Sequence, residues 1–217
     1  MTIQLRVYVP DHPLIKHWLA IARSVQTPYP LFKTAMTELG RWLTYEATRY
    51  WYPTVDVIVE TPLADCPATI INEDIPTVII PILRAGLAIL DGAQTALPNN
   101  ASIYHLGLVR DEETLESSCY LNKLPDRFLP QTHIIILEPM LATGGSIQNA
   151  LSEIISRGGD PALIRIISIV AAPPALQKLS EKYPSLNIYT AIIDEGLNEK
   201  GFIVPGLGDA GDRAFGT

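Results

Sequence analysis

The chain has 217 residues, of which 47% are hydrophobic and 18% charged, so it is long enough to bury one core and too apolar to be disordered. Its formal net charge of −7 argues against a nucleic-acid surface, because such a surface needs clustered basic residues. Cys66 and Cys119 have no second ligand at metal-binding spacing, and neither a membrane span nor a signal segment is visible. We therefore expect a single cytoplasmic domain that binds neither nucleic acid nor membrane.

Two amphipathic helices are predicted near the N-terminus. Apolar residues recur at helical spacing from Pro13 to Ala22, and again after Pro30 through Arg49. Both helices precede any predicted strand, so we expect residues 1–50 to cover the sheet or to form a subunit surface. The large aromatic side chains of this segment fit either an interface or the core: Trp18, Trp42 and Tyr45.

The rest of the chain alternates between strand and helix patterns, which is typical of an α/β protein. Val55–Val59 alternates as a half-buried strand does, whereas Val78–Leu83 reads as a fully buried strand that a helix follows from Leu87. Residues 110–125 form a polar segment, and residues 201–217 are too irregular for a regular element. Further strands are predicted at Ile103–Val109, Ile134–Leu137, Leu163–Ala172 and Ile188–Ile193, with a helix over Ile147–Ile155.

The loop from Glu138 to Ser146 follows a buried strand and leads into a helix. Its two glycines allow close backbone approach to a ligand, and the hydroxyls of Thr143 and Ser146 lie near a helix start whose amides attract anions. A plain helix cap explains the same residues about equally well. Glu138 favours a ligand site, because ligands bind at the carboxyl ends of strands in open α/β sheets. The loop lacks a Walker lysine, which argues against kinase chemistry.

Two arginines also end predicted strands. Arg84 follows six nearly continuous apolar residues, so it either pairs with a carboxylate at the core edge or clamps an anion. Arg110 occupies an equivalent place and opens a charged run of the kind that is usually a solvated loop.

The segment from Gly206 to Gly211 matches the dinucleotide pattern G-x-G-x-x-G. It lacks the preceding strand and following helix that a dinucleotide site needs, so we reject that interpretation. A packed tail and a backbone lining for a small planar ligand are the two remaining readings.

Four motifs follow one another along the chain in this order: Pro81–Gly86, Gly107–Thr114, Glu138–Ser146 and Gly206–Asp212. Together they closely resemble the uracil phosphoribosyltransferase family, and His12–His17 and Tyr45–Arg49 extend the resemblance over nearly the whole chain. The resemblance implies a single domain, 1–217, with the type I phosphoribosyltransferase fold. In that α/β fold, helices flank a central, mostly parallel sheet. It also implies the N-terminal helices of 1–50, a flexible arm over 110–125 and a Gly-rich uracil-binding hood over 194–217.

The activity implied by the resemblance is transfer of the phosphoribosyl group from phosphoribosyl pyrophosphate (PRPP) to N1 of uracil, giving UMP and pyrophosphate. The implied cofactor is Mg²⁺, bound with PRPP. The implied catalytic residues are Arg84, Arg110 and Asp209. These three would also contact PRPP, together with Glu138, Pro139, Met140, Leu141, Ala142, Thr143, Gly144, Gly145 and Ser146. Uracil would contact Ile203, Gly208, Asp209 and Ala210.

Two positions depart from the family pattern. Glu138 stands where the family usually has Asp, and Phe202 stands where it usually has Tyr. They motivate an alternative function, a regulatory or nucleotide-binding protein with weak catalysis. The resemblance further suggests a homodimer or higher homo-oligomer, and GTP as a candidate effector.

Overall fold

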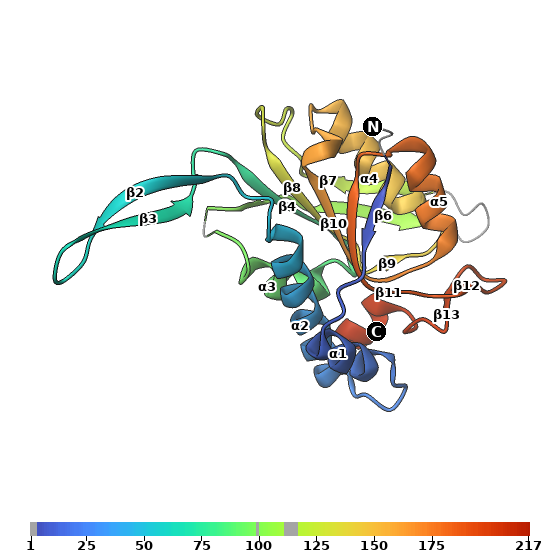
Figure 1. The fold of residues 1–217 in the computed structure, drawn as a ribbon. Helices are drawn as coiled ribbons and strands as arrows, with labels where there is room; N and C mark the ends of the chain where they lie inside the picture. The colour runs from blue at the N-terminus through green and yellow to red at the C-terminus, as the bar shows by residue number, and fades with distance from the viewer. Residues whose placement is uncertain (1–3, 99, 111–116) are drawn as a thin grey trace.

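The computed structural model describes residues 4–98, 100–110 and 117–217, and a nine-stranded sheet forms its centre (Figure 1). The strands are β1 (Arg6–Tyr8), β4 (Thr77–Leu83), β5 (Ser102–Ile103), β6 (Leu106–Arg110), β7 (Ser117–Asn122), β8 (His133–Leu137), β9 (Met140–Leu141), β10 (Ile164–Ala171) and β11 (Asn187–Ile193). Their order is β1-β11-β10-β8-β4-β6-β7, with β5 beside β4 and β9 beside β10. Within this nine-stranded sheet, as far as the structure describes it, β6 and β7 form the one antiparallel pair, and the other neighbouring strands are parallel. The predicted α/β class with a mostly parallel sheet is confirmed.

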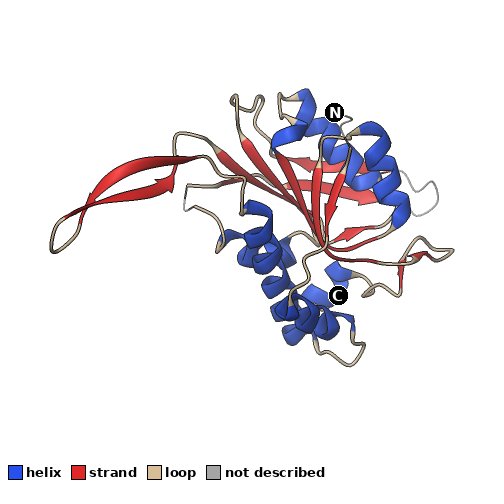
Figure 2. Ribbon diagram, in the orientation of Figure 1, coloured by secondary structure: helices blue, strands red, loops and turns tan. Residues whose placement is uncertain are grey.

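Helices cover both faces of this sheet (Figure 2). The first face carries α1 (Pro13–Arg23), α2 (Tyr29–Thr48) and α3 (Leu87–Gln94), and the second carries α4 (Gly145–Ser156) and α5 (Pro173–Lys182). Successive residues of β8 alternate between the two cores: Ile135 and Leu137 pack with the first set, Ile134 and Ile136 with the second. Because both faces are covered, the central strands are apolar at nearly every position.

A long antiparallel hairpin projects from this body (Figure 1). Its strands are β2 (Thr54–Glu60) and β3 (Asp65–Ile71), paired along their whole length from Thr54 with Ile71 to Glu60 with Asp65. The prediction of a half-buried strand is wrong in its burial, since no residue of either strand is buried. The alternating pattern of β2 is therefore not caused by contact with the core.

Three other expectations need correction. β1 precedes the N-terminal helices and pairs with β11, so the sheet begins earlier than predicted. The strand expected over Ile103–Val109 is split into β5 and β6, and the break lies beside Pro81 of β4, which has no N–H to donate to a ladder. α5 was not predicted, although Pro173 and Pro174 suit its first turn.

The polar segment and the tail also contain regular elements. Residues 117–122 of the expected arm form β7, while residues 111–116 lie outside the described residues, so the mobility of the arm stays a prediction. The expectation of an irregular tail is wrong. β12 (Gly196–Leu197) pairs with β13 (Ile203–Val204), and α6 (Ala210–Phe215) follows. The remaining element is a short 3-10 turn, Pro161–Leu163, and within the described ranges no helix has the length and hydropathy that a membrane crossing requires.

Small residues let α2 and α3 pack backbone to backbone. A Cβ built on Gly92 of α3 would lie 1.8 Å from the carbonyl oxygen of Thr37, and one on Gly40 of α2 would lie 2.5 Å from that of Ile89. Neither contact has a flexible side chain that could move aside. This packing fixes α3, and with it the loop that carries Arg84.

Gly92→Ala should therefore lower the free energy of unfolding by about 1–3 kcal/mol, the usual range for an overpacked core. Urea denaturation measures the change. Gly196→Ala is the matched control, because a Cβ there meets nothing within 4 Å and its cost should stay below about 0.5 kcal/mol. Equal stability of the two variants would contradict the close packing.

Candidate active site

A cavity of about 890 Å³ opens at the carboxyl ends of the central strands. Its lining comes from the loop after β8, the start of α4, and the larger part of the predicted hood, residues 196–217, to which the word hood refers below. The lining residues are Leu108, Glu138, Met140, Leu141, Ala142, Thr143, Gly144, Gly145, Ser146, Ile147, Glu199, Lys200, Gly201, Phe202, Ile203 and Asp209. Of the predicted PRPP loop, all but the buried Pro139 line this cavity.

The loop before α4 presents its backbone to the cavity. Gly144 is the N-cap residue and has a φ of 82°, in the left-handed region that favours glycine. No side chain caps this helix, and its first turn carries no acidic residue. The first N–H groups of α4 are thus left for another acceptor, and the helix dipole favours an anion there. The plain-cap explanation of Thr143 and Ser146 does not describe this structure.

Glu138 is the acidic residue of the loop. It follows β8 directly and accepts a hydrogen bond from the Met140 N–H, which lowers its pKa. Removal of the carboxyl from bulk water has the larger and opposite effect, and it raises the pKa of Glu138 to about 8. At neutral pH the side chain is therefore mostly a neutral carboxyl that can donate a hydrogen bond.

This pKa predicts how stability depends on pH. Between the ordinary pKa of 4.5 and about 8, the folded state holds a proton on Glu138 that the unfolded state has lost, so rising pH destabilises the fold. The difference in unfolding free energy between wild type and Glu138→Gln should fall across this window, by at most about 1.4 kcal/mol per pH unit, and level off above it. Thermal unfolding at several pH values measures it. A difference that rises with pH would show that the pKa is lowered.

The hood supplies the other wall. Ile203, Phe202 and Asp209 line the cavity, and Asp209 also caps α6 by accepting a hydrogen bond from the Asp212 N–H at 3.0 Å. Gly208 and Ala210 flank Asp209 in the chain but are not part of the lining. The structure thus brings Ile203 and Asp209 to the phosphate loop, and the uracil contacts of the other two stay a prediction.

The two predicted arginines are placed differently. Arg84 has a half-exposed side chain that bonds Asp212 at 2.8 Å and Thr217 at 3.3 Å, beside the start of α6 and outside the cavity lining. The peptide bond between Leu83 and Arg84 is cis. Arg110 ends β6 opposite Ser117, and its side chain lies outside what the structure describes. Contact of either arginine with pyrophosphate stays a prediction.

One buried carboxylate ties the hood to the body. Asp194, directly after β11, forms an ion pair with Arg23 at the end of α1, and its side chain is only 2% exposed. Its second oxygen accepts a hydrogen bond from the Gly206 N–H at 2.9 Å. Arg213 of α6 adds bonds to the carbonyls of Ala22 and Leu207, both at 2.6 Å. The hood is therefore fastened to α1 by charged groups at two points.

Asp194→Asn should destabilise the fold by about 3–5 kcal/mol, because it leaves the Arg23 cation without its partner in a nearly buried place. The free energy of unfolding in urea measures the loss. Asp11→Asn is the control, because Asp11 pairs with Lys16 of α1 in full solvent and losing that pair should cost far less than losing the buried one. Similar losses in both variants would argue against a special role for the buried pair.

Several lining residues were not predicted from the sequence. Leu108 and Ile147 belong to predicted elements but gave no functional signal, whereas Glu199, Lys200 and Gly201 form the turn between β12 and β13. The Asn-Glu-Lys-Gly sequence of that turn is typical of a hairpin and could have revealed it. Lys200 adds a cation to the cavity wall.

Three acidic side chains line the cavity, of which Glu199 and Asp209 can serve as carboxylate ligands beside the neutral Glu138. Over the described ranges, no three His, Cys, Asp or Glu side chains come together in a way that could hold a metal ion. Carboxylate oxygen is nevertheless a ligand that Mg²⁺ prefers, and Mg²⁺ usually combines one or two such groups with substrate phosphates and water. The lining suits a metal that arrives with a phosphorylated substrate.

Comparison with known proteins identifies the family. The sequence model described as uracil phosphoribosyltransferase matches residues 9–217. The uracil phosphoribosyltransferase of Nostoc sp. is 68% identical over the full length of both chains, and that of Nicotiana tabacum is 52% identical over 99% of this chain and 95% of its own. The solved structure of the AQ2163 protein from Aquifex aeolicus is 38% identical, with a TM-score of 0.86 over 96% of this chain and 97% of its own. The chain therefore belongs to the uracil phosphoribosyltransferase family.

Proposed function

We infer that the protein transfers the phosphoribosyl group of PRPP to N1 of uracil, which yields UMP and pyrophosphate for pyrimidine salvage. The observation that carries this function is a single cavity between the uncapped start of α4 and the hood, in a chain of this family. A phosphate, a ribose and a planar base need three different surfaces. The cavity offers amides, a carboxyl group and an apolar wall.

The loop 142–146 would hold the 5′-phosphate. Its N–H groups face an anion with the roughly half positive charge of the α4 N-terminus behind them. Glu138 would bond the ribose hydroxyls, and its raised pKa leaves a neutral carboxyl that both donates and accepts. A neutral side chain at this place also avoids repulsion of the nearby phosphate.

Arg84, with Arg110, would neutralise the pyrophosphate leaving group. The ion pair between Arg84 and Asp212 is about half exposed on both sides, so it is worth only ~0–1 kcal/mol and is easily exchanged for a pyrophosphate oxygen. Asp209 lies three residues from Asp212 on the cavity wall and could hold Mg²⁺ that binds with PRPP. The ion would supply charge neutralisation for the departing pyrophosphate.

The base would lie against the hood. By family resemblance, main-chain groups of Ile203, Gly208 and Ala210 pair with the acceptor-donor-acceptor edge of uracil. The amino group of cytosine would meet an N–H there, and such a mismatch costs on the order of 1–3 kcal/mol. We identify no side chain as a general base, so electrostatic stabilisation would provide most of the rate.

Formation of UMP from uracil and PRPP with Mg²⁺ tests the proposal directly. We expect turnover that depends on all three components and that cytosine does not support. Binding of UMP without turnover at millimolar substrates would instead support the regulatory alternative.

Glu138→Asp should keep or raise kcat/KM for PRPP, because the shorter carboxyl still reaches the same hydroxyls and is the usual family residue. Steady-state kinetics measures the effect. Glu153→Asp, on α4 and outside the cavity lining, is the matched control and should leave the kinetics unchanged. A loss above tenfold in Glu138→Asp alone would argue against the ribose role.

A homodimer or higher homo-oligomer is part of the proposal. An isolated two-stranded hairpin is marginally stable in water, yet β2 and β3 project with Ile58 67% and Ile70 47% exposed, which supports their burial by another copy. Trp18 and Trp42 pack against the core, whereas Tyr45 is 53% exposed and stays an interface candidate. Sedimentation velocity tests the oligomeric state.

Two further parts rest on the sequence. GTP as an effector follows from the resemblance alone, and UMP formation with and without GTP tests it. A cytoplasmic location is supported by the two exposed, unpaired cysteines, Cys66 and Cys119. The Arabidopsis thaliana relative, 51% identical, is named chloroplastic, so fractionation of the source cells is the deciding measurement.

A further inference from the structure

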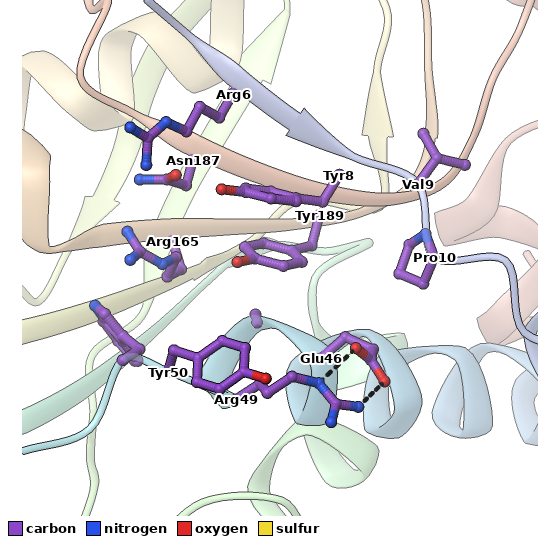
Figure 3. A pocket seen from close by; sticks show the side chains of 12 residues that line it. Arg6, Tyr8, Val9, Pro10, Glu46, Arg49, Tyr50, Arg165, Asn187 and Tyr189 are labelled. Carbon is purple, nitrogen blue, oxygen red and sulfur yellow. Dashed lines mark hydrogen bonds and ion pairs between the residues drawn. The ribbon is translucent and has the colours of Figure 1, made fainter. Parts of the chain in front are cut away.

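A second cavity, of about 390 Å³, lies at the opposite end of the sheet from the proposed active site. It is built from the amino ends of β1, β10 and β11 and from the C-terminal end of α2 (Figure 3). None of the roles discussed above uses its residues, apart from the covering function of α2. Its size falls in the range of sites for small ligands.

Two arginines and an amide form one row across the floor of this cavity. Arg6 of β1 and Arg165 of β10 are both register partners of Asn187 on β11, so the three side chains leave the same face of the sheet. Neighbouring strands are about 4.8 Å apart, which puts the two arginines on either side of the amide. Figure 3 shows all three heads at one end of the cavity.

Two phenol groups point into the same place. Tyr8 and Tyr189 are the next register partners and stack with ring centroids 4.6 Å apart. In Figure 3 both hydroxyls are directed toward the end where Arg6, Arg165 and Asn187 lie. Burial raises the pKa of Tyr189, so its hydroxyl remains protonated and able to donate a hydrogen bond. Five donor side chains therefore converge on one volume.

The positive charge of this row has no carboxylate partner. Among the described residues neither Arg6 nor Arg165 forms an ion pair, and the one acidic lining residue, Glu46, is bound to Arg49 at 2.7 Å. The buried Nε of Arg165 makes no hydrogen bond, although its Nη1 donates to the carbonyls of Ala162 and Ile164. Burial lowers the pKa of Arg165, and Arg6 lowers it further, while Tyr189 and Tyr8 partly offset the shift. None of the groups that offset it is a carboxylate.

We propose that this cavity is an anion site for the phosphoryl group of a small molecule, bound between Arg6 and Arg165. A phosphoryl group accepts bonds from several directions, and this suits donors that come from three strands. The ligand is either free phosphate or a phosphate ester, whose remainder would lie toward Tyr50 and Trp51 on the α2 side.

Trp51 provides the measurement, because the guanidinium of Arg165 lies 5.3 Å from its ring centroid. Inorganic phosphate is titrated into the protein at constant ionic strength, and tryptophan fluorescence is followed, because Trp51 lines this cavity and not the catalytic one. We expect saturable binding whose signal is lost in Trp51→Phe. Arg6→Gln and Arg165→Gln should each raise the Kd at least tenfold. Arg6 is exposed, so its variant folds even if the Arg165 variant does not.

Arg127→Gln is the matched control, since Arg127 is exposed and lies outside both cavities, and its Kd should stay within twofold of wild type. UMP formation by Arg6→Gln should equal that of wild type. A second arm uses ribose 5-phosphate, and tighter binding than phosphate identifies an ester as the ligand, whereas equal binding identifies free phosphate. Succinate that binds as tightly as phosphate, an unchanged Kd in Arg6→Gln, or no saturable binding at all would each overturn the proposal.

Discussion

The buried carboxylate of Asp194 is the constraint on which the arrangement of the active site depends. It holds the end of α1 through Arg23 and the hood through the Gly206 N–H, at the point where β11 leaves the sheet. A buried charge is tolerated only with good partners, so the three segments cannot separate without a large cost. Together with Arg213, which bonds the carbonyl of Ala22, this side chain fixes the cavity wall formed by the hood relative to the sheet.

Opposite that wall, the charge of the cavity is set by backbone and burial more than by basic side chains. The uncapped start of α4 offers donors that carry no full charge, and the raised pKa of Glu138 removes a negative charge close by. Because of both effects, the loop can attract a phosphate although it contains no lysine or arginine. The cations nearby are Lys200 on the cavity wall and Arg84 outside the lining, where it is paired with Asp212.

Local features could be predicted from the sequence, and distant ones could not. The strand, loop and helix around Glu138 follow from periodicity and two glycines within twenty residues. The partner of Arg84 is Asp212, 128 positions away, and only folding brings them together. β1 is three residues long and gives no periodic signal, and the hairpin strand β2 shows alternation without a core to cause it. The sequence therefore predicts that β2 is a strand but not that its side chains are exposed.

Under the two proposals, this acidic chain would bind anions at both ends of its sheet. At the carboxyl end the strands lead into helix N-termini, so backbone amides attract the anion. At the amino end none of the described lining residues belongs to a helix start, so side chains must provide the charge. The chain does so with Arg6 and Arg165, set one strand apart on each side of Asn187. Because the net charge is −7, these unpaired arginines stand out as a local excess, and an unpaired half-buried cation is a feature that ligand binding explains better than stability does.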